Sequence, residues 1–298
     1  MTSTRATGIA LAFCTAIVSG VSIFLNGHAV RHFGDATAYT TAKNAIAGVL
    51  LLALAAAPAR RPAQARPAPV RAARAIAVVA VVGGSVPFVL FFEGLARAHA
   101  TQAAFIQKTL VVWVALLAVP LLRERFRVPH ALAVCLLLAG QAVIVGHAGT
   151  ITLGTGEWMI LGATLLWSIE VVYVKRVLAW IPPRTLAAAR MALGTVLLLG
   201  WLAVSGRLGV LTSYDATQWR WVLLSGLLLT AYVATWYAAL ARAQAIDVTA
   251  VLVFGAVVTA FLSAVEDGAA VSMPGVALVA AGAALVAITA LRPGYRRA

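Results

Sequence analysis

The sequence contains ten apolar stretches, each about as long as a helix that crosses a membrane. An α-helix rises about 1.5 Å per residue, so about 20 apolar residues span the ~30 Å hydrocarbon core of a bilayer. Of the 298 residues, 62% are hydrophobic and only 11% are charged. We therefore expect an all-α integral membrane protein with ten transmembrane helices. They are predicted at residues 8–30, 36–57, 72–96, 100–121, 128–147, 155–178, 184–203, 218–241, 247–265 and 274–291.

The positive charges are distributed unevenly between the loops. If the N-terminus is cytoplasmic, most of the 23 Lys and Arg residues fall in cytoplasmic loops, and the loops on the other side hold only Arg31, Arg97, Arg207 and Arg220. The positive-inside rule then predicts that both termini are cytoplasmic, in a multi-pass protein of a bacterial-type inner membrane. The net charge of +14 does not indicate nucleic-acid binding, because the cations are spread over membrane-edge loops.

Two phrases occur twice, about 145 positions apart. FEGLARAHA at 92–100 matches YAALARAQA at 237–245, and KNAIAGVLLL at 43–52 matches RMALGTVLLL at 190–199. Each pair falls in equivalent helices of two successive groups of five, so we predict a tandem duplication with domains at 1–150 and 151–298. Because five is odd, the second domain crosses the membrane in the opposite sense. Such inverted repeats are typical of secondary transporters that work by alternating access.

An acidic and basic corner, LLRERF (121–126), closes the fourth predicted helix, and VEDGAAVSMPG (265–275) closes the ninth. With ten helices in two halves, this pattern resembles the drug/metabolite transporter superfamily, specifically its EamA-type exporters. The resemblance covers the whole chain and implies a small-molecule transporter, with YddG-like amino-acid exporters as the nearest functional model. Members of the family often have proline in the middle of helices 4 and 9, where this chain has IQKTLVV and VFGAVV.

Ionisable residues inside the predicted helices are the first candidates for a binding site, because charge at membrane depth is costly unless it is paired or hydrated. Lys43, Glu93 and Lys108 are all predicted in the outer half of the first repeat, and Asn44 and Gln107 lie beside two of them. A cavity open to the outside would bring these groups together around a zwitterion. The alternative is a buried Lys–Glu pair that holds helices 2, 3 and 4 together.

In the second repeat, Glu170 and Arg190 are predicted near the cytoplasmic side. They are candidates for an inner gate or for a static ion pair, and Glu170 is also one helical turn from Lys175. Aromatic residues that could contact a substrate are Phe88, Phe92, Trp167, Trp236 and Tyr237, although each could equally be a packing residue. Pro87, after GGSV, is predicted to kink its helix.

No motif for a metalloprotease, a P-loop or a Ser/His/Asp triad is found. We therefore expect no enzyme activity, no cofactor and no metal, and the expected partners are a small-molecule substrate and membrane lipids. The predicted function is export of small amphipathic metabolites, most of all amino acids including aromatic ones. One alternative is transport of organic or phosphorylated anions held by Lys43 and Lys108, and a more remote one is an intramembrane lipid-modifying enzyme.

Overall fold

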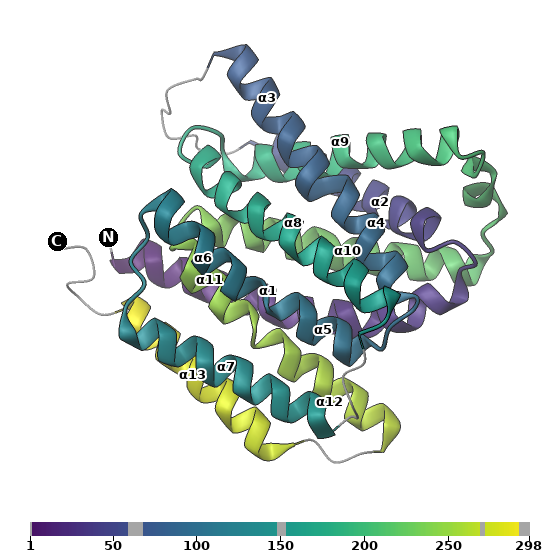
Figure 1. The fold of residues 1–298 in the computed structure, drawn as a ribbon. Coiled ribbons are helices and arrows are strands. Elements are labelled where there is room, and N and C mark those ends of the chain that lie inside the picture. Colours follow the sequence, from purple (N-terminus) through teal and green to yellow (C-terminus); the bar gives the residue numbers. More distant parts are fainter. Residues whose placement is uncertain (1, 59–67, 148–152, 269–271, 292–298) are drawn as a thin grey trace.

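The computed structural model describes residues 2–58, 68–147, 153–268 and 272–291, and these residues are helical nearly throughout (Figure 1). The arginines at 60, 61, 66, 292, 296 and 297, predicted on the cytoplasmic side, lie outside the described residues. The first half contains α1 (Thr2–Ala29), η1 (Val30–His32), α2 (Ala36–Ala56), α3 (Pro69–Val79), η2 (Ala80–Ser85), α4 (Val86–Leu95), α5 (Ala100–Lys108), α6 (Leu110–Leu122) and α7 (Val128–His147). The second half contains α8 (Thr155–Val177), α9 (Pro183–Val204), η3 (Leu208–Ser213), α10 (Ala216–Leu240), α11 (Ala245–Leu252), α12 (Gly255–Asp267) and α13 (Met273–Leu291).

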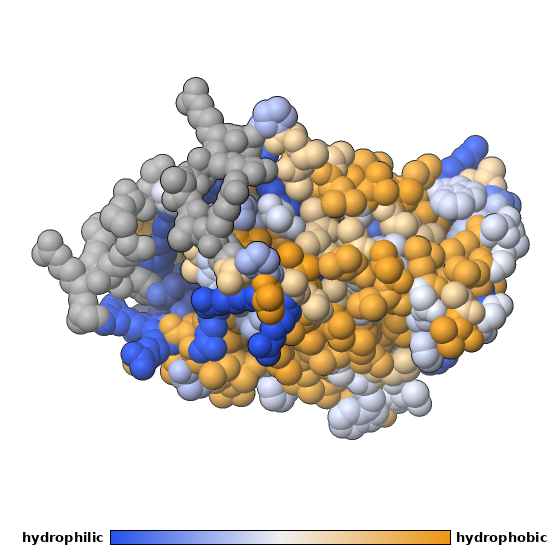
Figure 2. Space-filling model, turned by 90° about the horizontal axis from the view of Figure 1, so that it is seen from above, coloured by the Kyte–Doolittle hydropathy of each residue, from blue (hydrophilic) through white to orange (hydrophobic). Residues whose placement is uncertain are grey.

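The helices have the length and composition that a membrane requires. Within the described residues, nine helical segments are long and apolar enough to cross a bilayer, and a tenth, in α7, has a shorter apolar stretch over Val128–Ile144. The face seen in Figure 2 is mostly hydrophobic across its middle, with hydrophilic residues toward its two ends. The all-α membrane fold predicted from the ten apolar stretches is confirmed.

Three of the predicted helices are not continuous. The span predicted at 72–96 contains a π-helical turn, η2, which ends just before Pro87. The span at 100–121 breaks at Thr109, and the span at 247–265 breaks at Val253 and Phe254. The last two breaks are tight turns with hydrogen bonds to the third residue back, such as Val112 N–H to the Thr109 carbonyl, and neither break contains a proline.

The two halves pack on each other in an equivalent way. Helix α1 of the first half packs against α10 and α12 of the second half. In the same way, α8 of the second half packs against α4 and α6 of the first. The long helices α2 and α9 contact each other between the halves, whereas α7 and α13 pair along one edge of the molecule (Figure 1). The fifth and tenth predicted helices therefore form one edge of the bundle.

The helix bundle has two ends, which we call the terminal face and the opposite face. The terminal face is the end at which α1 begins and α13 ends, on the left of Figure 1, and the opposite face is the other end. The connections from α6 to α7 and from α10 to α11 lie at the terminal face. The connections from α4 to α5 and from α12 to α13 lie at the opposite face.

Candidate functional site

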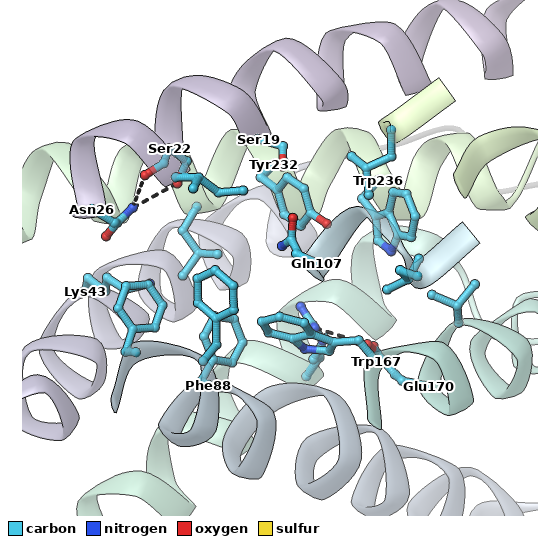
Figure 3. A pocket seen from close by; sticks show the side chains of 18 residues that line it. Ser19, Ser22, Asn26, Lys43, Phe88, Gln107, Trp167, Glu170, Tyr232 and Trp236 are labelled. Atoms are coloured by element: carbon cyan, nitrogen blue, oxygen red, sulfur yellow. Dashed lines mark hydrogen bonds and ion pairs between the residues drawn. The ribbon is translucent and has the colours of Figure 1, made fainter. Parts of the chain in front are cut away.

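A central cavity lies between the two halves and is lined by both (Figure 3). The cavity offers about 70 Å³ to the centres of water molecules, which is enough for a few waters. To hold a molecule as large as an amino acid, its walls would have to move apart. The lining residues are Ser19, Ser22, Ile23, Asn26, Lys43, Phe88, Phe91, Phe92, Gln107, Leu110, Trp167, Glu170, Val171, Arg190, Leu229, Tyr232, Trp236 and Leu252.

Lys43 reaches the cavity from α2, and its ammonium group lies against aromatic rings. Its Nζ atom is 3.9 Å from the centre of the Phe92 ring and 5.1 Å from that of Phe88, in the geometry of cation–π contacts. Its one polar contact among the described residues is with Oδ1 of Asn44, at 3.5 Å, which is too long for a strong hydrogen bond. The lysine is 2% exposed and has no carboxylate partner among the described residues.

A hydrogen-bonded group of polar side chains lies at the same end of the cavity as Lys43 (Figure 3). The amide of Asn26 donates to the carbonyl oxygen of Ser22 at 2.6 Å and to its hydroxyl at 3.0 Å. The hydroxyl of Tyr39 donates to Oδ1 of Asn26 at 2.6 Å and also contacts the hydroxyl of Ser225. These bonds fix the orientation of Asn26, and both Asn26 and Ser22 line the cavity.

Glu170 and Arg190 form an ion pair at the other end of the cavity. Nε of Arg190 lies 2.9 Å from Oε1 of Glu170, and Nη2 donates to Oε2 at 3.1 Å. The hydroxyl of Tyr237 donates to Oε1 at 2.6 Å. Both charged side chains are nearly fully buried. The two-pronged contact and the added hydroxyl compensate for the loss of water around the charges.

The Glu170 side chain finds room because Gly83, in the π-helical turn η2, has no side chain. A Cβ atom at Gly83 would clash with the carboxyl group of Glu170. The carbonyl oxygen of Gly83 would bond the N–H of residue 87 in a regular helix, but Pro87 has no N–H. The indole nitrogen of Trp167 donates to this oxygen at 3.2 Å. The predicted irregularity at Pro87 thus positions two residues of the cavity wall.

Four of the residues predicted to bind substrate do not line the cavity: Asn44, Glu93, Lys108 and Tyr237. Glu93 accepts hydrogen bonds from Thr37 and Arg97 at 2.7 Å each. Lys108 donates to Ser19 and Gln107 at 2.8 Å each. The expected meeting of Glu93 with the two lysines does not occur. The carboxylate pairs instead with Arg97, which lies four residues further along the chain, just after the end of α4.

Three polar residues of α1 line the cavity and were not predicted: Ser19, Ser22 and Asn26. The first predicted helix, at 8–30, has no Asp, Glu, Lys or Arg that would mark it as part of a binding site. The spacing of these three residues could have predicted them, because positions i, i+3 and i+7 lie on one face of a helix. A polar stripe on an apolar helix indicates a face turned toward protein or water.

The terminal face is held together by polar contacts between the halves. The carboxylate of Glu124, just after α6, accepts hydrogen bonds from the backbone N–H groups of Ala245 and Ile246 at 2.8 and 3.0 Å. Burial raises the pKa of the Glu124 carboxyl, although these two N–H groups and the charge of Lys175 oppose that shift. Lys175 donates to the carbonyl of Leu240 at 2.6 Å, so it does not pair with Glu170.

A second ion pair lies close to this contact. Arg5, near the start of α1, pairs with Asp247 of α11 at 2.7 Å, and Nε2 of His130 lies 3.4 Å from the other carboxylate oxygen. Asp247 is fully buried. At the opposite face, by contrast, the ends of α1, α5 and α12 surround a cavity of about 430 Å³, where His28 contacts Glu266 at 2.9 Å.

The comparison with known proteins agrees with this architecture. A solved crystal structure of a protein matches the fold with a TM-score of 0.70 and 18% sequence identity, covering 91% of this chain and 97% of that chain. No curated protein matches the sequence. The model of the EamA-like transporter family matches twice, at residues 6–146 and 154–290. The chain is a membrane protein of the EamA-like transporter family, built from two repeats of the family's domain.

Proposed function

We propose that this protein exports small amphipathic metabolites that carry a carboxylate, with amino acids, including aromatic ones, as the first candidates. The observation that carries the proposal is Lys43, a buried lysine on the cavity wall whose ammonium group faces phenyl rings. A carboxylate can pair with the ammonium group, while the apolar part of the substrate contacts Phe88, Trp167 and Trp236.

We further propose that transport proceeds by alternating access, with the substrate between the domains at 1–150 and 151–298. Two inverted repeats around one cavity support this mechanism. In this proposal the contacts of Glu124 and Asp247 close the terminal face, and the face with the larger cavity is open. With both termini in the cytoplasm of a bacterial-type cell, the terminal face is the inner one, and Glu170 and Arg190 belong to the moving parts.

A second candidate substrate class is favoured by one specific observation. Glu170 is the only acidic residue on the cavity wall of the described chain, and Arg190 and Tyr237 already engage it. No second carboxylate is therefore available there for the ammonium group of an amino acid. An organic anion without an ammonium group could pair with Lys43 and would leave no positive charge of its own unpaired in the cavity. Lys108, which was predicted to join Lys43 in binding anions, stays a candidate for reorganised states only.

Uptake into liposomes that contain the purified protein tests the proposal. Labelled phenylalanine is offered alone and in competition with other amino acids, organic acids and phosphorylated sugars. Saturable uptake that amino acids or organic acids inhibit supports carboxylate transport. Uptake inhibited by phosphorylated sugars alone would contradict it. A Lys43→Gln variant is compared with Arg220→Gln, which removes a cation at an exposed residue outside the cavity. Loss of uptake in the first variant alone shows that the effect is specific to the cavity.

A further inference from the structure

The cavity has two ends that the repeat relates to each other. The matched phrases align Lys43 with Arg190 and Phe92 with Tyr237. Lys43 and Arg190 both line the cavity, and each lies beside its aromatic neighbour: Nζ of Lys43 is 3.9 Å from the Phe92 ring centre, and the guanidinium carbon of Arg190 is 5.9 Å from that of Tyr237. The two ends are therefore variants of one arrangement, and their differences are informative.

The equivalence extends to α1 and α8. A Cβ atom added at Gly8 would meet that of Arg242 at 2.9 Å, and one added at Gly156 would meet that of Arg97 at 3.0 Å. Arg97 and Arg242 are aligned in the repeated LARA phrases, so Gly8 and Gly156 hold equivalent positions. Counting the same number of residues onward from each glycine leads to Ser22 in α1 and Glu170 in α8.

The two ends therefore differ in one charge. In the second half, Arg190 and the hydroxyl of Tyr237 hold the carboxylate of Glu170. In the first half, a serine stands where the second has the glutamate, and a phenylalanine stands where it has the tyrosine. Lys43 consequently occupies the position equivalent to Arg190, but no carboxylate among the described residues pairs with it.

At this end of the cavity, Lys43 and Ser22 carry N–H and O–H donors that are not fully used by acceptors among the described residues. The Ser22 hydroxyl accepts from Asn26, so its own hydrogen can donate, and the described residues contain no acceptor for it. The ammonium group of Lys43 has three N–H donors and only the long contact with Asn44. A cation and a hydroxyl donor at the same end of the cavity favour an anion.

From these relationships we infer that the substrate's carboxylate binds between Lys43 and Ser22 and takes the part that Glu170 plays in the second half. The ligand class is a monocarboxylate with an apolar or aromatic body, since Phe88, Trp167 and Tyr232 line the space between the two ends. The amino group of an amino acid is tolerated and not required. This inference rests on the proposed carboxylate transport and assigns Ser22 as the residue that keeps the position open to a ligand.

The experiment uses three probes that differ only in charged groups: phenylalanine, 3-phenylpropanoate and phenethylamine. Binding of each to the purified full-length protein is measured by calorimetry, and uptake is measured in liposomes. Both carboxylates are expected to bind at least about tenfold more tightly than phenethylamine, because only they form the charge-assisted bonds. Equal binding of the amine and 3-phenylpropanoate would overturn the inference.

The decisive variant is Ser22→Glu, which supplies the carboxylate within the chain. It is expected to weaken both carboxylates at least about tenfold and to leave phenethylamine unchanged or tighter. Ser22→Gln adds similar bulk without charge and is expected to weaken carboxylates much less. If Ser22→Glu fails to fold, Lys43→Gln serves instead, with the same loss for carboxylates and none for the amine.

The outcomes separate the two proposals. Wild-type protein that transports carboxylates while Ser22→Glu and Ser22→Gln behave alike would overturn the assignment of Ser22 and leave the proposed function standing. Wild-type protein that neither binds nor transports any carboxylate would overturn the proposed function and the inference with it.

Discussion

The indole nitrogen of Trp167 donates a hydrogen bond to the carbonyl oxygen of Gly83 at 3.2 Å. The bond joins α8 of the second repeat to the π-helical turn of the first, beside the central cavity. It exists because Pro87 cannot donate to that oxygen. A feature visible in the sequence as a helix irregularity thus becomes an attachment point between the repeats.

Replacing Trp167 by Phe should leave the ring contacts and remove this bond. The ring centre of Trp167 lies 5.6 Å from that of Phe88 and 5.4 Å from that of Phe91. The Gly83 carbonyl oxygen would be left without a hydrogen-bond donor in a buried site. We therefore expect the free energy of unfolding to fall by about 1–2 kcal/mol. Denaturation in detergent measures it. Trp158→Phe, at a residue 58% exposed, is the control, and an equal loss there would contradict the explanation.

Gly84→Ala should interfere with the packing of η2 on α9. A Cβ atom at Gly84 would clash with the backbone carbonyl of Arg190 and lie 3.2 Å from Cα of Gly194. Backbone atoms cannot rotate away as a side chain does, so we expect destabilisation of about 1–3 kcal/mol or more. Gly200→Ala is matched to it, because Gly200 is also helical and has open space around it. There alanine should stabilise the helix by about 0.5–1 kcal/mol. The difference in unfolding temperature between the two variants is the measurement.

Glu170→Gln should be more harmful than removal of the whole ion pair. The single variant leaves Arg190 buried without a counter-charge, for which we expect a loss of about 3–5 kcal/mol. The variant with both Glu170→Gln and Arg190→Met should lose less than Glu170→Gln alone, and therefore less than the sum of the single changes. A double-mutant cycle on unfolding free energies measures the coupling. Additive losses would mean that the two charges do not stabilise each other.

Glu124→Ala should loosen the terminal face. It removes the acceptor of two backbone N–H groups at the start of α11, so we expect faster hydrogen exchange at Ala245 and Ile246 and a loss of about 1–3 kcal/mol. Asp215→Ala is the control, because Asp215 accepts the N–H of Gln218 within its own helix. That change should reduce stability by about 1 kcal/mol without altering exchange at Ala245 and Ile246. Unchanged exchange in Glu124→Ala would show that the contact does not hold the face closed.

The sequence by itself determined the membrane fold and its two-fold organisation. Long apolar stretches can cross a bilayer only as helices, because each backbone polar group must be satisfied within the segment. The repeated phrases around Lys43 and Phe92 identified equivalent helices, and Pro87 marked an irregular one. These signals are local in the chain, and their physical consequences do not depend on which helices become neighbours.

Only the tertiary structure decided which polar groups meet. From sequence, Glu93 was as good a partner for Lys43 and Lys108 as any other group, since all three were predicted at similar depth. Depth fixes one coordinate of a side chain, whereas its direction around the helix and the neighbour it faces depend on packing. Arg97 is closer to Glu93, and Ser19 and Gln107 engage Lys108. The pairing of Glu170 with Arg190 rather than Lys175, and the stripe of Ser22 and Asn26 on the cavity wall, follow from how the two repeats close on each other.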